Sequence, residues 1–517
     1  MPPPAYQPLK GFAPDLDPTT PGIIVDCSMM VPTLKGMKGA ASMVATQLPA
    51  LPKQSIGAAT VQLLSGTLRA FAGMSDAIYE SISSSWTNVT RRSATGLLFS
   101  GGDPLNARMG ESVLAAGDPI PYKSTNDNTW RFAQFGNVTL AVNGADVIQQ
   151  TVTSGPFTDI PGAPIAELID VTQGFVFVAN VTDPTYGERP DGYWCSGIYD
   201  QTVWTPSIAT QCVTARLIDT PGEITACRAL GSNIVLYKGN SFYLGTYQGP
   251  PVVWGFNVVS NQIGVLSQEA VISIGTAHLF AGNDNFYIYD GTRPLPIGDE
   301  VKEWFFANRS PSALYRMRSM RDPRNSLCYW FFVSVDSLDQ KTLDRGLVFN
   351  HRANKWGRAD YVIENPFEQV VGQMTYDSLG TFYPTWDQLP SVSYNSPFWV
   401  QSSRLPAVID TAHKVQTLTG ACVTSGLQTG EFGDDEVYTD LQYVRIRCVL
   451  DPLSATMATR HRYTLGNTKD EQTRFTVLED GKFDVDASAR WHNALFVFKG
   501  DIEIVGFSPA LVPDGAQ

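Results

Sequence analysis

The sequence of 517 residues contains neither a long apolar run nor a block of basic residues. No apolar stretch reaches the roughly 18 residues that a membrane span needs, and Met1–Gly22 lacks the apolar core of a signal peptide. We therefore expect a protein without a membrane span that is made and folded in a cytosol. With 37 Lys and Arg against 50 Asp and Glu, the net charge is −13, which disfavours proteins that bind free DNA through its phosphates.

Local catalytic motifs are also missing. The sequence has no GxxxxGK[ST], GxGxxG, HExxH or GxSxG, so nucleotide binding, zinc hydrolysis and a nucleophile elbow have no local support. From this we predict no enzymatic activity, no cofactor, and no catalytic, cofactor-binding or metal-ligating residue.

Cysteine and histidine do not form ligand patterns. The cysteines lack a CxxC pair and are odd in number, which predicts free and mostly buried thiols. The histidines never fall at metal-ligand spacing, so we interpret each as a packing or surface residue. The residues concerned are Cys27, Cys195, Cys212, Cys227, Cys328, Cys422 and Cys448, and His278, His351, His413, His461 and His492.

A few local groups allow two interpretations. Asp434, Asp435 and Glu436 are consistent with a calcium loop, but without EF-hand spacing they favour a solvated turn. Asp484 and Asp486 would share one face of a strand, either as an acid/base pair or as surface carboxylates, and we favour the latter. The aromatic clusters could stack sugars or bases, but strand spacing favours the core of a sheet. They are Gly192–Cys195, Phe286–Tyr289 and Cys328–Phe332.

Turn-forming and aromatic residues are abundant: the chain has 44 Gly, 34 Pro, 26 Phe, 20 Tyr and 11 Trp. This composition favours many short strands closed by turns, hence an all-β fold. The stretch LFAGNDNFYIYDGTRPLPIG (Leu279–Gly298) shows the pattern of a strand, a tight turn, a second strand and a stop.

This hairpin pattern recurs along the chain. Further copies are Leu64–Glu80, Phe135–Gln149, Thr172–Asp183, Leu230–Tyr247 and Arg324–Ser334. Their irregular spacing is centred near the roughly 40–50 residues of a four-stranded blade, which predicts a β-propeller of six, or possibly seven, blades. A Trp soon after a strand end, as at Trp86, Trp204 and Trp356, is typical of kelch-type blades. An array of hairpins in a β-sandwich is the alternative.

The predicted organisation has three parts. Residues 1–20 are Pro-rich and predict an extended arm, loose or docked on a neighbour, whose removal up to Pro18 leaves the body folded. Residues 21–410 form the propeller, with short helical connectors at Asp299–Phe306 and Pro311–Met320. In residues 411–517, polar and apolar residues alternate as in strands that expose one face to solvent. This pattern predicts a separate C-terminal β-sandwich.

Three segments, CRALGSNIVLYKGNSFYLGTYQGPPVVWGF (Cys227–Phe256), GVLSQEAVISIGTAHLFAGNDNFYIYDGTRPLPIG (Gly264–Gly298) and ARWHNALFVFKGDIEIVGF (Ala489–Phe507), together resemble the tail-hub or tail nozzle proteins of short-tailed bacteriophages. The likeness begins at PGIIVDCSMMVPTLKGMKGAAS (Pro21–Ser42) and extends almost to the C-terminus.

The resemblance implies a structural virion protein of the viral tail, made in the host bacterial cytoplasm. Six copies would form a ring below the head-to-tail adaptor, extend the DNA-ejection channel and help retain the genome until ejection. The implied partners are the homohexamer, the adaptor, tail fibres or spikes, a tail needle, and double-stranded DNA that passes without specific binding. Six copies of a chain with charge −13 would repel phosphates. The alternative is a receptor-binding or polysaccharide-depolymerising tail component.

Overall fold

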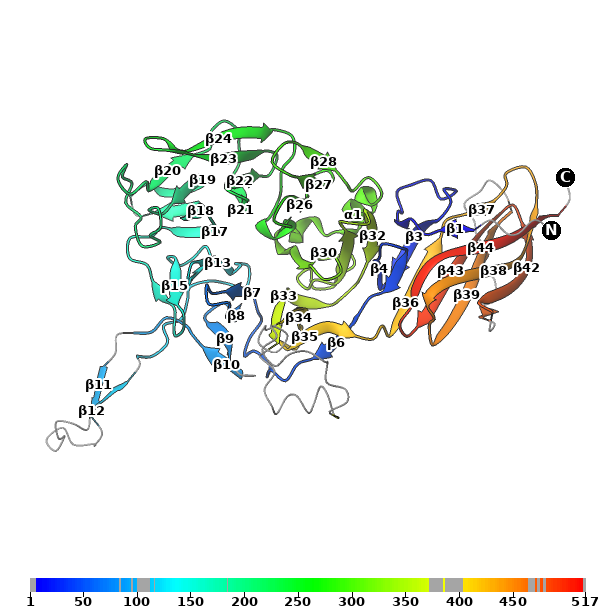
Figure 1. Cartoon of the computed structure of the whole chain (residues 1–517), viewed down its shortest axis with the longest axis horizontal. Coiled ribbons are helices and arrows are strands. Elements are labelled where there is room, and N and C mark those ends of the chain that lie inside the picture. The colour runs from blue at the N-terminus through cyan, green and yellow to red at the C-terminus, as the bar shows by residue number, and fades with distance from the viewer. Residues whose placement is uncertain are drawn as a thin grey trace. The chain divides into compact units, whose positions relative to one another are not determined.

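The computed structural model describes residues 6–82, 85–93, 96–99, 112–115, 117–183, 185–371, 385, 403–463, 470–471, 475–477 and 480–514. The chain divides into two compact units, and each is treated by itself below. Figure 1 labels their strands and helices. Unit 1 comprises Met1–Ala45, Glu269–Ile363 and Gln416–Gln517, and unit 2 comprises Thr46–Gln268 and Glu364–Val415.

The predicted fold class is confirmed: the protein is all-β, with propeller blades and a C-terminal β-sandwich. Within the described residues, seven sets of four strands form blade-like sheets, the larger of the two blade numbers expected. Six are separate four-stranded sheets, and the seventh, β29-β30-β31-β32, forms one end of a ten-stranded sheet. The strands within a blade are antiparallel neighbours, as the recurrent hairpin pattern requires.

Among its described residues, unit 2 contains four complete blades and, of a fifth, nearly all of β33 and the whole of β34. The complete blades consist of β7 (Gly57–Gln62), β8 (Leu68–Gly73), β9 (Ile78–Ile82) and β10 (Ser85–Asn88); β13 (Arg131–Phe135), β14 (Val138–Val142), β15 (Gln149–Val152) and β16 (Thr158–Asp159); β17 (Ile165–Thr172), β18 (Phe175–Asp183), β19 (Gly187–Cys195) and β20 (Val213–Arg216); and β21 (Ile224–Leu230), β22 (Asn233–Lys238), β23 (Phe242–Gly249) and β24 (Val253–Ser260). A two-stranded ribbon, β11 (Gly96–Phe99) and β12 (Ser112–Ala115), follows the first blade. The fifth sheet has the order β33 (Ile363–Val371), β34 (Ser403–Asp410), β35 (Val415–Gly420), β6 (Ser42–Ala45).

Consecutive blades of unit 2 share apolar cores. The core between β17–β20 and β21–β24 contains Phe177, Tyr243 and Trp254, all at most 4% exposed. Similar clusters join β13–β16 to β17–β20, and β7–β10 to its two neighbours. Burial of these faces supplies the stabilisation that short strands lack on their own.

Unit 1 contains two further blades. They consist of β25 (Val271–Ser273), β26 (His278–Ala281), β27 (Phe286–Tyr289) and β28 (Pro294–Pro296), and of β29 (Arg318–Asp322), β30 (Leu327–Phe332), β31 (Arg345–Asn350) and β32 (Lys355–Arg358). Every residue of β30 is buried, as predicted for Cys328–Phe332. Trp330 lies 5.2 Å from the Phe286 ring and 5.8 Å from the Trp356 ring, and its indole N–H donates to the Ala270 carbonyl.

The part of unit 1 that the structure describes has, within it or at its edge, three short helices: η1 (Gln268–Ala270), α1 (Lys302–Asn308) and η2 (Pro311–Arg316). The last two overlap the two predicted connectors. The Asp15 carboxylate accepts the backbone N–H groups of Glu303 and Trp304 in the first turn of α1. These are among the N–H groups that a helix cannot satisfy by itself.

The sandwich in unit 1 combines strands from both ends of the chain. One sheet continues from β32 through β4 (Met30–Pro32), β5 (Met37–Gly39), β44 (Glu503–Pro513) and β38 (Thr439–Leu450) to β42 (Lys482–Ala489), with β1 (Gln7–Pro8) also paired to β44. The other has the order β2 (Gly11–Phe12), β3 (Ile23–Ser28), β36 (Thr424–Thr429), β43 (Trp491–Lys499), β39 (Ser454–Arg462), β40 (Asp470–Glu471); β37 (Phe432–Gly433) pairs with β43 and β41 (Phe475–Thr476) with β39. The division therefore differs from the predicted boundaries at residues 20 and 411, because β1–β5 enter the sandwich sheets and β35 runs on to Gly420.

The N-terminal arm is extended but docked on its own chain, which corrects the expectation of a loose or neighbour-bound arm. Leu9, Phe12 and Ala13 are at most 2% exposed. The Phe12 ring meets the Trp304 ring edge-on at 5.2 Å. Removal of residues 1–18 would delete the Phe12 ring that covers Trp304 and leave α1 without Asp15, so we expect the body to lose stability.

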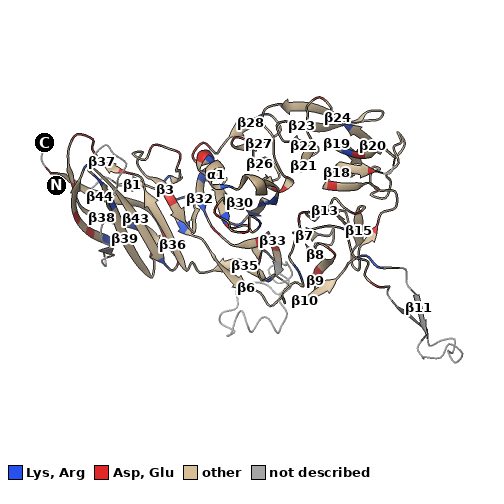
Figure 2. Ribbon diagram, turned by 180° about the vertical axis from the view of Figure 1, so that it is seen from behind, with Lys and Arg blue, Asp and Glu red and all other residues tan. Residues whose placement is uncertain are grey.

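Charged residues of both signs are interspersed along the ribbon of the described residues (Figure 2). Among those residues, no helix has the length and apolar character needed to cross a membrane.

Candidate functional site

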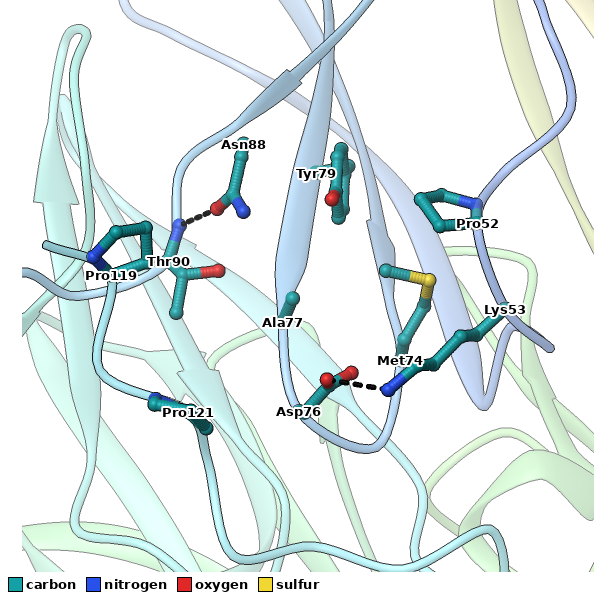
Figure 3. A pocket seen from close by; sticks show the side chains of 10 residues that line it. All are labelled: Pro52, Lys53, Met74, Asp76, Ala77, Tyr79, Asn88, Thr90, Pro119 and Pro121. Atoms are coloured by element: carbon teal, nitrogen blue, oxygen red, sulfur yellow. Dashed lines mark hydrogen bonds and ion pairs between the residues drawn. The ribbon is translucent and has the colours of Figure 1, made fainter.

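A small pocket in unit 2 is the first candidate site (Figure 3). Its volume is about 150 Å³. It is formed by the segment before β7, the β8–β9 turn, the end of β10 and the segment after the β11–β12 ribbon. The side chains that line it are Pro52, Lys53, Met74, Asp76, Ala77, Tyr79, Asn88, Thr90, Pro119 and Pro121.

The polar groups of this pocket are held by short-range bonds. Lys53 Nζ lies 2.7 Å from Asp76 Oδ2, with side chains 58% and 38% exposed, so water screens this ion pair. The Asn88 side-chain oxygen accepts the Thr90 N–H, and the Thr90 hydroxyl oxygen accepts the Ile78 N–H. These bonds fix the turn after β10. The remaining wall of the pocket includes three prolines and Tyr79.

The size of the pocket limits what it can bind. Ligand sites for small molecules usually enclose about 300–1,000 Å³, whereas a cavity of about 150 Å³ accommodates one benzene-sized group. The pocket is therefore suited to one apolar side chain or ring, with Lys53 and Asp76 available to polar atoms beside it.

Glu364 and His413 contact each other beside residues 51–55, which include two residues of the pocket wall. His413 Nδ1 is 2.7 Å from Glu364 Oε1, and the second carboxylate oxygen of Glu364 accepts the Ser55 N–H. Burial raises the pKa of Glu364, although Ser55 and His413 act in the opposite direction. The Leu51 N–H also donates to the His413 backbone carbonyl. Together these hydrogen bonds hold residues 51–55 against β33 and the turn between β34 and β35.

A second pair of ionisable groups, His461 and His492, is buried inside the sandwich of unit 1. Their Nδ1 atoms are 2.8 Å apart and the residues are 0% and 1% exposed. From the sequence each was interpreted as a packing or surface residue, and nothing there indicated a contact between them. The contact depends on the register of β39 and β43, which places the two residues directly opposite each other.

The acidic candidates lie on the surface of the sandwich. Asp434 accepts the N–H of Glu436, and Asp435 accepts the Trp491 indole N–H, which is the behaviour of a solvated turn. Asp484 and Asp486 are exposed on β42, and Asp484 pairs with Lys482. Among the described residues, no group of three or more His, Cys, Asp or Glu is placed to hold a metal ion.

The aromatic clusters and the cysteines belong to cores. Gly192–Cys195 is buried, as are three of the four residues of β27. All seven cysteines are free thiols, six of them buried. Burial raises the pKa of Cys195, Cys212, Cys328 and Cys448 to about 12, so these thiols stay protonated and unreactive at neutral pH.

No protein-family model matches the chain, and no curated protein matches it. Solved structures that it resembles include the WD40 domain of Neurospora crassa Pan2, at 6% identity and a TM-score of 0.35, covering 71% of this chain and 96% of that chain. AztD from Citrobacter koseri is 12% identical, with a TM-score of 0.32 and coverage of 61% and 78%. An exo-β-1,3-galactanase from Phanerochaete chrysosporium is 9% identical, with a TM-score of 0.27 and coverage of 90% and 100%.

The galactanase match corrects one prediction. The absence of local motifs led us to predict that the chain is not an enzyme, whereas an enzyme is among the structures it resembles. The prediction is withdrawn, because glycosidase carboxylates come from separate strands and leave no local motif to find. At 9% identity the match assigns no activity and no residue to this chain.

Proposed function

We propose that the chain is a tail nozzle protein of a short-tailed bacteriophage, six copies of which extend the DNA-ejection channel below the head-to-tail adaptor. The observation that carries the proposal is where the resembling segments fall. Cys227–Phe256 covers the end of β21, β22, β23 and part of β24; Gly264–Gly298 covers β25–β28; and Ala489–Phe507 covers β43 and the start of β44. A likeness limited to blades would fit any propeller, whereas this one includes the sandwich.

The N-terminal resembling segment supports the same proposal. Pro21–Ser42 contains β3, β4 and β5, which enter both sheets of the sandwich. The likeness therefore follows the parts of the chain that make up this particular combination of blades and sandwich. The net charge of −13 supports a conduit, because an acidic wall repels DNA phosphates and lets the duplex slide.

Electron microscopy of the purified chain mixed with adaptor rings from the same particle tests the proposal. We expect rings of six copies seated on the adaptor, since a rotationally closed interface gives rings instead of filaments. Single copies that do not close into a ring on the adaptor would contradict the proposal. They would favour the receptor-binding or polysaccharide-depolymerising alternative, which release of reducing ends from host capsule would then support.

DNA binding provides an independent test. A conduit should bind a fluorescent duplex weakly at physiological salt, and the weak binding should change little between low and high salt. Tight binding with a steep salt dependence would mean that the chain neutralises many phosphates. That result would contradict the proposal of a channel that DNA passes without binding.

A further inference from the structure

The turns at one end of the four complete blades of unit 2 form a continuous surface. Because neighbouring strands of a blade are antiparallel, the turn after its first strand and the turn after its third strand lie at the same end. Hydrogen bonds join these turns, or the strand ends beside them, from each blade to the next. The bonds run from the Leu64 N–H to Asn137 Oδ1 at 3.0 Å, from Gln201 Nε2 to Gln150 Oε1 at 3.2 Å and from the Tyr247 hydroxyl to Gln211 Oε1 at 2.6 Å.

We call this surface the neutral face, because its turns carry almost no charge. The described turns are residues 63–67, 136–137, 153–157, 173–174, 196–212, 231–232 and 250–252, and Asp200 is their single Asp, Glu, Lys or Arg. The Asp200 carboxylate accepts the N–H and the hydroxyl of Thr202 at 2.8 and 2.6 Å. By contrast, the turns at the opposite end of the same blades include Asp76, Asp146, Asp219 and Glu223.

Several apolar side chains of the neutral face are exposed. Leu64 is 79% exposed, Tyr199 77%, Ile208 67% and Val252 54%. The Tyr199 ring lies against Gly174, where an added Cβ would come within 2.5 Å of a ring carbon, and the Tyr199 N–H donates to the Gly174 carbonyl. Exposed apolar groups that gather on one surface mark interaction sites, and the cores of protein interfaces are depleted in charge and enriched in Tyr.

The lack of charge limits what the neutral face can bind. Nucleic acids and anionic lipid surfaces are bound through Lys and Arg, and the described turns of this face contain neither. A strongly charged protein surface would lose its hydration there without gaining an opposite charge. The matching surface should therefore be uncharged too.

We propose that the neutral face binds the same face of a second copy of the chain. The net charge of −13 makes two copies repel each other, and a contact made through the neutral faces keeps most like charges outside the interface. Around a two-fold axis, the apolar side chains of each copy meet an uncharged surface on the other. This inference does not rest on the proposed tail function, whose ring requires a contact of a different symmetry.

The salt dependence of this contact should differ from that of a charged interface. Added salt screens the repulsion between two chains of the same net charge but leaves apolar contact in place. We therefore expect two copies to associate more tightly in about 0.5 M than in about 0.05 M sodium chloride. Association that weakens over this range would mean that ion pairs hold the copies together and would contradict the proposal.

Sedimentation velocity of the whole chain tests the contact with a matched pair of variants. Ile208→Glu places a charge in the neutral face, whereas Ile218→Glu adds the same charge beside Asp219, at the opposite end of the same blade. The two isoleucines are 67% and 75% exposed, so both variants should fold. We expect the wild type and Ile218→Glu to form dimers of similar affinity, and Ile208→Glu to dissociate at least about tenfold more readily. Equal dissociation constants for the two variants would overturn the proposal, as would a wild type that stays monomeric at about 100 μM in about 0.5 M salt.

Hydrogen–deuterium exchange of the unmodified chain locates the contact without a substitution. When the protein concentration is raised at high salt, protection should increase in peptides from residues 196–212 and stay constant in peptides from residues 217–223. An increase confined to other parts of the chain would mean that the copies associate through another surface, and the proposal would be wrong. Protection that does not depend on concentration would also contradict it and would leave the neutral face to an uncharged partner other than a second copy.

Discussion

The blades pack their sheets through apolar contacts, whereas the sandwich adds a buried polar contact to apolar ones such as Phe483 against Phe496 at 5.6 Å. Between β17–β20 and β21–β24, Phe177 meets Trp254 edge-on at 4.7 Å within a core of apolar side chains. At the β42–β43 corner of the sandwich, the two sheets are joined through His492 and the Thr439 carbonyl. Apolar contacts are non-directional, whereas a buried hydrogen bond depends on the distance and direction between its two groups. The blades are thus expected to respond mainly to loss of volume, and this corner of the sandwich also to loss of a hydrogen-bond partner.

The largest effect should come from Trp330→Ala in a blade. Trp330 is 0% exposed, and its loss creates a cavity beside Phe286 and leaves the Ala270 carbonyl without its indole partner. We expect a loss of about 3–5 kcal/mol in the free energy of unfolding, measured with urea. Leu338→Ala is the control, because that fully exposed side chain should change stability by no more than about 0.5 kcal/mol. A Trp330→Ala chain as stable as the control would mean that the blade interior is not packed around this ring.

The difference between local patterns and contacts of distant segments explains how much of the structure the sequence predicted. The strand around Trp330 was predictable because an apolar run bounded by turn residues reports burial locally. The predicted helical connectors also matched α1 and η2, where the pattern is again local. The His461–His492 pair was not predictable, since it depends on the register of β39 against β43, which no spacing in the sequence records. The contact of Asp15 with the start of α1 was not predictable either, because it joins residues 288 positions apart.

The docked arm should give the next largest effect. Phe12→Ala removes a 0% exposed ring that lies against Trp304, and we expect a loss of about 3 kcal/mol in stability. Leu16→Ala, at a side chain 36% exposed, is the matched control in the same segment. Thermal unfolding of both variants separates a docked arm from a loose one: equal melting temperatures for the two would contradict docking.

A polar contact of the arm should matter less. Asp15→Ala removes a carboxylate that accepts the Glu303 and Trp304 N–H groups at 2.6 and 3.0 Å, and such caps contribute about 0.5–2 kcal/mol. We expect a loss of about 1 kcal/mol by urea unfolding. Asp17→Ala is the control, because its carboxylate accepts hydrogen bonds from the nearby Thr19 in an exposed turn. A larger loss of stability in Asp17→Ala than in Asp15→Ala would contradict the conclusion that Asp15 caps α1.

The smallest effect should come from Lys53→Ala at the pocket of unit 2. The Lys53–Asp76 distance of 2.7 Å is short, but side chains that are 58% and 38% exposed gain little from pairing in water. We expect a change of no more than about 0.5 kcal/mol, shrinking further as salt screens the pair. The pocket wall of prolines, Met74 and Tyr79 does not depend on this pair and should keep its shape. A loss above about 1 kcal/mol that persists at high salt would mean that Lys53 stabilises the blade through its aliphatic stem instead of its charge, because apolar contact is not screened.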